Sequence, residues 1–562
     1  MTATVERPAR LELPEKTVRR DQRRWAIAIA LVIGWSIATA GLDVSEIVNE
    51  RGVTQLRKFF AAMVAPDLSP SMLSLTVREA GVTVGYALLG TALAVMIGAV
   101  GGVLLTERIW SSQQGVMGRG RYGWATARVL LAVPRSMHEV VFGLILVNIL
   151  GLDPLVAVLA IGIPYGAVTA KVFAELLDDV SLDAEQALRA SGAGRLTAFV
   201  FGTVPQALND LLSYAFYRFE CSLRSAAILG IVGAGGLGFQ LALSFQSLRY
   251  DEMWTLLWAL VILSGLADRW SSVVRRRRNS LAAETHADTA DPSVVAKAPA
   301  ADRFLQLSVL VGAISVPVAW VALGIEISNL WSERARILTA ELVRDAWPPE
   351  IGADGWAGLI SDSLDTIALA VLSTAIAFAI ASPIAFLARR PSGGRPGLAH
   401  VGGLLLSSAL RFVLLVARSV PPPVWAFVVV FVLFPGLWPG AVALAIYNGG
   451  VLGRLQGEVV ENQDPRPAET LKATGATAAG ALTVATAPAV ASRFVALGLY
   501  RWEVAIRETV VVGIVGAAGL GRRLDEQTSA FAYDKIVVTI AALFVVTVAV
   551  DFASASIRRS LR

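Results

Sequence analysis

Long apolar stretches dominate the pattern of hydrophobic and polar positions along the chain. Residues 80–106 and 419–453 contain no Asp, Glu, Lys or Arg. A helix needs about 20 mostly apolar residues to cross a bilayer, so such stretches predict membrane spans. In the first half of the chain we expect six spans, near residues 25–42, 81–105, 124–150, 155–175, 205–229 and 252–272.

The second half of the chain repeats the first at an offset of 283 residues. With this shift Thr83 falls on Thr366 and Glu220 falls on Glu503. A repeat of this kind indicates a duplicated structural unit. The sequence therefore predicts an all-α polytopic membrane protein that contains two six-helix modules and twelve transmembrane helices.

Basic residues predict the orientation of these modules in the cell (plasma) membrane. Seven Lys and Arg residues precede Trp25, and arginines occupy all four positions of 275–278. Because cytoplasmic flanks of spans carry an excess of Lys and Arg, we expect both termini in the cytoplasm. The predicted parts are a basic cytoplasmic segment, a first module, a cytoplasmic linker and a second module, at residues 1–24, 25–274, 275–303 and 304–562.

Composition supports a membrane protein and narrows the chemistry. Of the 562 residues 55% are hydrophobic and only 17% are charged, whereas soluble domains carry about 25% charged residues. A single cysteine, Cys221, and three histidines make a disulfide framework or a metal site unexpected. The net charge of +5 could suggest nucleic acid, but the basic residues cluster beside apolar spans, so we expect no nucleic-acid binding.

A polar segment between the fourth and fifth spans has the same spacing in both modules. In each copy a glycine follows a short polar run, and a proline follows the glycine by thirteen residues. This pattern predicts a short helix, a glycine turn, a second short helix and a span that begins at the proline. The residues concerned are Glu185, Gln186, Ala187, Gly192 and Pro205 in the first module and Glu469, Thr470, Gly475 and Pro488 in the second.

With this segment the chain resembles the membrane permease subunits of binding-protein-dependent ABC importers. Their cytoplasmic loop reads Glu-Ala-Ala, three residues, Gly, nine residues and Ile-x-Leu-Pro. Gln186 departs from the acid, and Gly202 and Ala485 depart from the isoleucine. The resemblance implies coupling helices that dock on two or more cytoplasmic ABC ATPase subunits, and an extracytoplasmic binding protein as a further partner.

The chain contains no Gly-x-x-x-x-Gly-Lys-Ser/Thr phosphate-binding loop. We therefore expect that the chain is not an enzyme and binds no cofactor itself. ATP and Mg²⁺ would bind on the separate ATPase subunits.

The fifth span of each module carries ionisable residues. Tyr217, Glu220 and Arg224 share one helix face, whereas Arg218 points roughly 100° away from it. Ionisable side chains within the membrane usually face a water-filled path, although they can also staple a helix or snorkel to the surface. The candidate pathway residues are Arg135, Tyr217, Arg218, Glu220 and Arg224 in the first module and Arg418, Tyr500, Arg501, Glu503 and Arg507 in the second.

These segments are similar to the permease subunit of phosphonate importers, in which Tyr-Arg-[Phe/Trp]-Glu precedes an arginine and a glycine-rich run. His138 and Pro422 depart from the Arg-x-x-Pro-Glu that this family tends to carry upstream. The resemblance implies a translocation pathway for phosphonate or related phosphorus oxyanions, namely phosphate or phosphite. Guanidinium groups bind such oxygens in a bidentate fork, and here they could form either a binding site or an electropositive path.

The glycines that follow each fifth span predict a tight turn on the outer side that contributes to a gate. Three of them, at 233, 235 and 238, also satisfy a dinucleotide-binding pattern, but no βαβ unit surrounds them. The predicted gate residues are Gly233, Gly235, Gly236 and Gly238 in the first module and Gly516, Gly519 and Gly521 in the second.

Two other interpretations of the sequence stay open. An ion-coupled secondary transporter can also be built from repeats, and Glu139, Glu220 or Glu503 would then carry protons. An ABC importer permease for another small solute, such as an amino acid, would have the same cytoplasmic loops.

Overall fold

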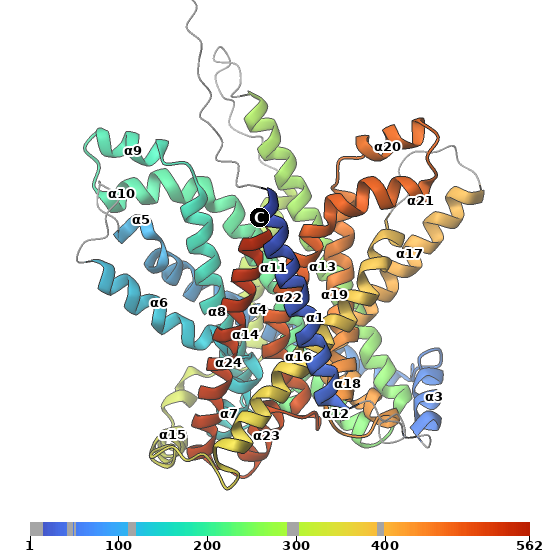
Figure 1. Ribbon diagram of the computed structural model, residues 1–562. Helices are drawn as coiled ribbons and strands as arrows, with labels where there is room; N and C mark the ends of the chain where they lie inside the picture. Colours follow the sequence, from blue (N-terminus) through green and yellow to red (C-terminus); the bar gives the residue numbers. More distant parts are fainter. Residues whose placement is uncertain are drawn as a thin grey trace, which may run out of the picture.

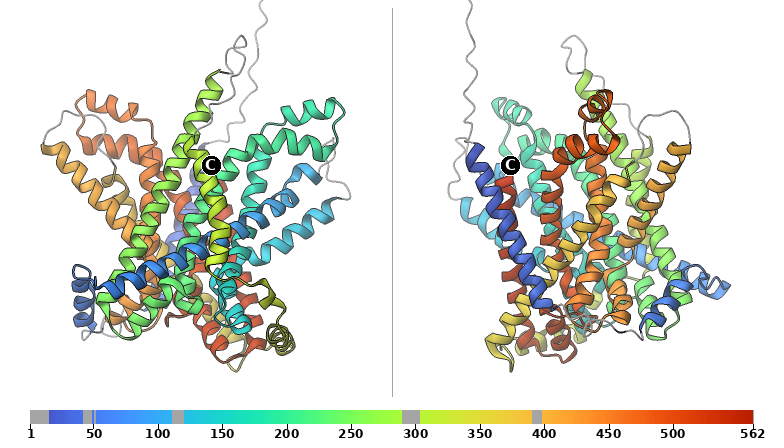
Figure 2. Two further views of the ribbon diagram at one scale, coloured as in Figure 1. Left: turned by 180° about the vertical axis from the view of Figure 1, so that it is seen from behind. Right: turned by 45° about the vertical axis from the view of Figure 1, so that its right-hand side comes forward.

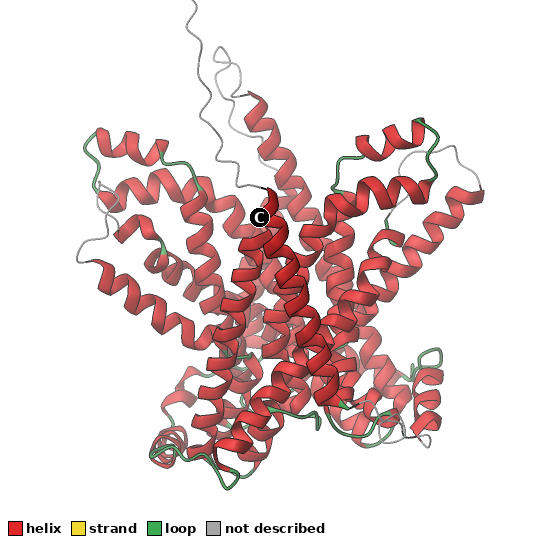
Figure 3. Cartoon of the chain, viewed as in Figure 1, coloured by secondary structure: helices red, strands yellow, loops and turns green. Residues whose placement is uncertain are grey.

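The computed structural model describes residues 15–41, 49, 52–110, 120–288, 303–389 and 398–561. These residues form helices joined by short loops, and no strand occurs among them (Figure 3). The predicted N-terminal segment up to residue 14 and the linker residues 289–302 lie outside the described residues.

The helices of the two modules follow the same order along the chain (Figure 1). Those of the first are α1 (Glu15–Ala40), α3 (Gly52–Ala62), α4 (Pro70–Leu105), α5 (Glu107–Trp110), α6 (Gly120–Ser136), α7 (Glu139–Leu150), α8 (Pro154–Asp179), α9 (Asp183–Ala190), α10 (Arg195–Ala198), α11 (Val204–Leu229), α12 (Gly236–Gln246) and α13 (Tyr250–Asp288). Those of the second are α14 (Arg303–Ala322), α15 (Glu333–Asp345), α16 (Gly355–Leu387), α17 (Leu398–Ser419), α18 (Pro422–Val432), α19 (Leu437–Glu461), α20 (Arg466–Ala473), α21 (Ala478–Ala481), α22 (Ala487–Gly513), α23 (Leu520–Ser529) and α24 (Tyr533–Leu561).

In the part of the chain that the structure describes, nine helices are long and apolar enough to cross a membrane. Two bent pairs, α6 with α7 and the segment through α11 with α12, raise this number to eleven if each pair is one span. The remaining predicted span, the fourth of the second module, corresponds to α19, which is not among these helices and which carries Arg454 and Glu458. Length and composition therefore support nine to eleven of the twelve predicted spans.

The third predicted span is not one straight helix. Residues 124–150 divide into α6 and α7, which meet at an angle of 83°. The Nδ1 atom of His138 accepts a hydrogen bond from the backbone N–H of Val140 at 3.3 Å, so this side chain caps the new helix. In the second module α17 ends before Pro421, where three consecutive prolines lack N–H donors and start α18.

The first helix of each module packs against the other module. Helix α1 lies on α16, and α14 lies on α4. Gly85 of α4 allows this approach, because a Cβ atom at this position would lie 2.8 Å from Cδ1 of Leu323. Each module is therefore packed against the first helix of the other. The segments that hold α9 and α20 project on opposite sides of one end of the molecule (Figures 1 and 2).

A largely buried ion cluster also connects the two modules. Glu220 of α11 and Asp268 of α13 come from the first module, and Arg418 of α17 and Arg454 of α19 come from the second. Arg454 lies 3.1 Å from Glu220, Arg418 lies 2.9 Å from Asp268, and Arg454 also pairs with Asp268. The four side chains are between 5% and 21% exposed. Breaking such a cluster leaves an uncompensated charge, so it favours this arrangement of the modules.

The pseudo-symmetric counterpart of this cluster is not formed. The equivalent residues are Glu503, Asp551, Arg135 and Lys171. Among the described residues, no ion pair within 4.0 Å joins any two of these four. Glu503 pairs with Arg558 instead. Lysine at position 171 lacks the planar fork by which an arginine bridges two carboxylates, which is consistent with this difference.

We predict that Asp268→Asn destabilises the protein more than Asp551→Asn does. The first substitution removes one of the two carboxylates of the cluster, so that Arg418 and Arg454 share Glu220 alone within it, at a cost of about 3 kcal/mol. The second removes no ion pair and should stay within about 1 kcal/mol of the wild type. The free energy of unfolding of the purified chain in mixed detergent micelles measures both effects, and equal losses would contradict a one-sided cluster.

Candidate functional site

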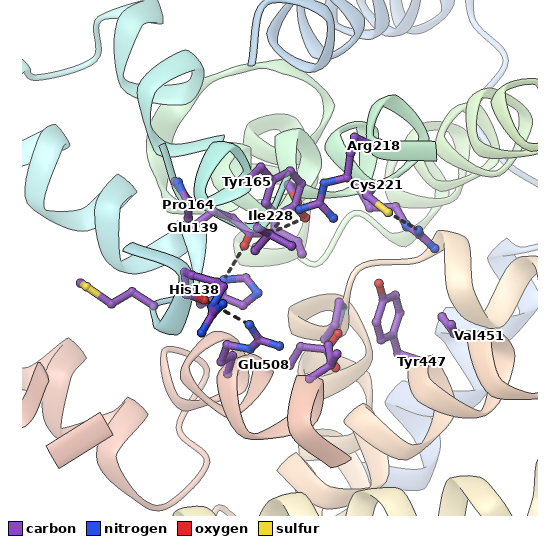
Figure 4. A pocket seen from close by; sticks show the side chains of 18 of the residues that line it. His138, Glu139, Pro164, Tyr165, Arg218, Cys221, Ile228, Tyr447, Val451 and Glu508 are labelled. Atoms are coloured by element: carbon purple, nitrogen blue, oxygen red, sulfur yellow. Dashed lines mark hydrogen bonds and ion pairs between the residues drawn. The ribbon is translucent and has the colours of Figure 1, made fainter. Parts of the chain in front are cut away.

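A cavity of about 150 Å³ lies where the two modules meet, with side chains from both converging on it (Figure 4). Helices α7, α8 and α11 supply one side, and α18, α19 and α22 supply the other. The lining residues that carry a charge, an imidazole or a hydroxyl group are Arg135, His138, Glu139, Tyr165, Tyr217, Arg218, Arg224, Ser225, Tyr447, Tyr500, Arg501, Arg507 and Glu508.

Seven of the ten predicted pathway residues line this cavity. They are Arg135, Tyr217, Arg218, Arg224, Tyr500, Arg501 and Arg507. The other three do not line it. Glu220 and Arg418 belong to the ion cluster, and Glu503 pairs with Arg558. Since Arg224 lies 3.9 Å from Glu220, the cluster borders the cavity directly.

Arg218 is the most distinctive cation of the cavity. It is 7% exposed, and its Cζ atom lies 3.9 Å from the centre of the Tyr165 ring and 5.7 Å from that of Tyr214. Among the described residues, no carboxylate lies within 4.0 Å of its guanidinium, and its Nε atom has no partner. Cation–π contacts thus offset part of the free-energy cost of burying this charge, and they leave its N–H groups available to a ligand.

Arg501 occupies the position equivalent to Arg218 but has protein partners. Its Nη2 atom donates to both carboxylate oxygens of Glu508, at 3.0 and 3.2 Å, and to the side-chain oxygen of Asn448. Asn448 stands where the first module has Tyr165. The two halves of the cavity therefore hold their equivalent arginines in different ways.

The cavity carries an excess of positive charge. Five arginines line it, against two carboxylates, Glu139 and Glu508. Arg507 donates to the backbone oxygen of Arg135 at 3.1 Å, and this oxygen lies in the last turn of α6, where a cation is favourable. Such a surface attracts anions. Among the described residues, no group of His, Cys, Asp and Glu side chains could hold a metal ion.

Sequence reasoning missed several lining residues, among them Tyr165, Ser225, Tyr447 and Glu508. Glu508 had a detectable signal, because it is a charged residue directly after Arg507 inside an apolar span. The tyrosines and the serine resemble ordinary helix residues, and only the fold brings them to the cavity.

The glycine-rich segments form the tight turns that the sequence predicts. They lie at the end of the molecule opposite α9 and α20 (Figure 1). In the first module the Oγ1 atom of Thr83 accepts the N–H of Leu237 at 2.9 Å, and in the second Thr366 accepts the N–H of Leu520 at the same distance. Positive φ angles occur at Gly233, Gly235, Gly236, Gly516 and Gly519.

Two glycines of these turns serve close packing instead. A Cβ atom on Gly238 would lie 1.8 Å from the backbone oxygen of Ala227, and one on Gly521 would lie 2.8 Å from Cα of Val510. Each turn is therefore pressed against the helix that precedes it. The role of these turns in a gate stays a prediction.

The two polar loops have the predicted helix, glycine turn and helix. Gly192 and Gly475 both have a φ of 93° between their short helices. Pro205 and Pro488 lie in the first turns of α11 and α22, as predicted. Gln186, Ala187, Glu469 and Thr470 are exposed on α9 and α20.

Glu185 differs from its neighbours on α9 because it is buried, with 3% exposure. Its carboxylate accepts hydrogen bonds from Thr203 at 2.8 Å and from Arg189 at 2.6 Å. This residue supports the loop from inside, so its exposed neighbours are better placed to contact a partner.

Comparison with known proteins places the chain among transport components. Residues 114–268 and 398–562 each match the family described as binding-protein-dependent transport system inner membrane component. The phosphate-import permease protein PhnE of Mycolicibacterium smegmatis is 29% identical over 89% of this chain and 88% of its own length. The phosphite transport system permease protein PtxC of Stutzerimonas stutzeri is 30% identical over 40% of this chain and 78% of its own length.

A shorter relative matches one part of the chain. The putative cryptic phosphonate transport system permease protein PhnE2 of Escherichia coli is 31% identical over 21% of this chain and 97% of its own length. The family match occurs once in each module and covers more than half of the chain. The chain therefore belongs to the family of inner-membrane components of binding-protein-dependent transport systems.

Proposed function

We propose that this chain forms the translocation pathway of an ATP-driven importer for phosphonate or related phosphorus oxyanions, such as phosphate and phosphite. The observation that carries the proposal is the cavity between the modules, where five arginines face two carboxylates. Arg218 in particular has buried N–H groups without an anionic partner among the described residues. A planar guanidinium group binds phosphorus oxyanions through two parallel hydrogen bonds.

The names of the relatives support the same class of cargo. They are described as permease proteins for phosphate, phosphite or phosphonate. An amino acid carries an ammonium group as well as a carboxylate, and a lining with five arginines and two carboxylates is unfavourable for a further positive charge. The charge of the cavity therefore favours an oxyanion over an amino acid.

An ion-coupled mechanism receives less support from the geometry. Two of the three candidate proton carriers, Glu220 and Glu503, lie outside the cavity and pair with Arg454 and Arg558. As a member of its family the chain is a multi-pass membrane component of a transport system and not an enzyme. We therefore assign ATP hydrolysis to separate subunits, which would bind ATP and Mg²⁺.

The two loops that hold α9 and α20 are the proposed docking sites for these ATPase subunits. Both project at the same end of the molecule, on opposite sides (Figure 2). A short exposed helix is suited to insertion into a groove on a partner. Two such helices imply at least two ATPase subunits. This end would face the cytoplasm together with both termini, and a binding protein would dock at the opposite end, near α12 and α23.

We predict that Arg218→Gln lowers oxyanion uptake by at least about tenfold, because it removes a buried charged donor. The measurement is the initial rate of uptake of radiolabelled phosphate by cells that express the complete importer. Arg128→Gln serves as the matched control, since Arg128 is exposed on α6 and stacks on Trp124 outside the cavity. Normal uptake by a well-expressed Arg218→Gln variant would argue against an oxyanion pathway at this cavity.

A second prediction concerns the loops. Ala187→Glu places a bulky charge on the exposed face of α9 and should reduce co-purification of the ATPase subunits by about tenfold. Thr470→Glu on α20 should have a similar effect if both loops dock. Ala340→Glu on α15 is the control, because it makes an exposed alanine acidic at the opposite end of the molecule. Full ATPase recovery with both loop variants would exclude these helices as docking sites.

A further inference from the structure

The two carboxylates of the cavity come from different helices in the two modules. In the first module Glu139 of α7 accepts a hydrogen bond from Ser225 of α11 at 2.5 Å. With the shift of 283 residues, Ser225 falls on Glu508 and Glu139 falls on Pro422. In the first module the acid lies on α7, and in the second it lies on α22, the counterpart of α11. Each half of the cavity therefore keeps one carboxylate.

Glu508 has an evident role as a counterion. Both of its oxygens accept hydrogen bonds from Arg501, which lies on the same helix. Pairing lowers the cost of burying this arginine, although it also removes one positive charge from the cavity.

Glu139 cannot be explained in this way. Glu139 is 5% exposed, and among the described residues no arginine or lysine lies within 4.0 Å of its carboxylate. A negative charge in a cavity that collects anions weakens their binding. Its side chain therefore imposes an electrostatic cost on an oxyanion cargo that no ion pair offsets.

One oxygen of Glu139 is free to accept a hydrogen bond from a ligand. The Oε1 atom accepts hydrogen bonds from Ser225 at 2.5 Å and from Tyr165 at 3.4 Å. The Oε2 atom lies 3.3 Å from Nδ1 of His138, but this nitrogen already accepts the backbone N–H of Val140. In that state Nδ1 carries no proton to donate, so Oε2 has no donor among the described residues.

We propose that Glu139 makes the cavity select an oxyanion that carries a hydroxyl proton. This inference rests on the proposed function. The guanidinium groups bind the charged oxygens of the cargo, and Oε2 of Glu139 accepts the hydrogen bond of its P–O–H group. An oxyanion without a proton meets an unpaired carboxylate at the same place and is repelled.

The discrimination follows from ordinary acid–base chemistry. Phosphate groups exchange a proton near neutral pH, so a protonated form is present under physiological conditions. Sulfate has the same shape and charge as doubly ionised phosphate but holds no proton at neutral pH. Glu139 would thus exclude sulfate from a path whose arginines alone accept both anions. Tyr165 and Ser225 are positioning residues, since they hold the carboxylate through its other oxygen.

The experiment compares binding of radiolabelled inorganic phosphate and sulfate to the full-length chain in lipid nanodiscs at neutral pH and constant ionic strength. The wild type is expected to prefer phosphate. Glu139→Gln should reduce this preference by about tenfold, mainly because sulfate binds more tightly. Glu139→Asp keeps a carboxylate and should retain most of the preference, which separates the effect from a folding defect.

Glu508→Gln is the matched control. It removes a cavity carboxylate that already has an arginine partner, so binding of both anions should increase and their ratio should stay within about twofold of the wild type. A wild-type chain that binds the two anions equally, or a Glu139→Gln variant with an unchanged ratio, would overturn the role of Glu139.

The proposed function fails in a different way. If Arg218→Gln abolishes the binding of both anions, but Glu139→Gln leaves the ratio of phosphate to sulfate binding unchanged, the oxyanion pathway stands without this selectivity. If the wild type binds neither anion and Arg218→Gln changes nothing, both the pathway and the selectivity are refuted.

Discussion

The burial of charge between the two modules is the constraint on which the rest of the structure depends. An ionisable group inside a membrane helix is costly unless it has a partner or faces water. Here the costly groups gather at the module boundary, where Glu220 and Asp268 meet Arg418 and Arg454. Arg224 lies at the edge of this cluster and also lines the cavity. In the ion cluster each arginine has a carboxylate partner. The cavity beside it keeps more arginines than carboxylates.

The cavity is pseudo-symmetric in position but not in chemistry. Tyr165 and Asn448 hold the two equivalent arginines differently, through a ring face in one half and an amide oxygen in the other. In a homodimer every substitution appears twice, because both subunits have one sequence. A fused chain has no such restriction, and its two halves can divide the binding of charge and the discrimination between cargoes.

Much of the fold follows from local sequence patterns. The repeat, most spans, the glycine turns and the loop helices depend on spacing along the chain, and spacing is visible without a structure. The bend between α6 and α7 was missed because a capping histidine, not a proline, starts the second helix. The ion cluster was out of reach, since Asp268 and Arg454 are far apart in the chain and only helix packing brings them together.

The arginines of the candidate site could be predicted from the sequence, but their partners could not. Arginines within apolar spans are conspicuous, and most of those singled out do line the cavity. Which carboxylate pairs with which arginine depends on side-chain geometry across helices. The inward orientation of Glu185 likewise depends on Thr203, which lies outside the short helix that carries the acid.

The exchange of first helices gives the fused chain a further property. Each half begins with the helix that covers its neighbour, since α1 lies on α16 and α14 lies on α4. If one half were synthesised alone, the surface of α4 or α16 that the other half covers would be exposed to lipid. The first helix of that half would also lack the surface on which it packs. Joining both halves in a single polypeptide fixes their stoichiometry at one to one, so neither half has to find its counterpart by diffusion in the bilayer.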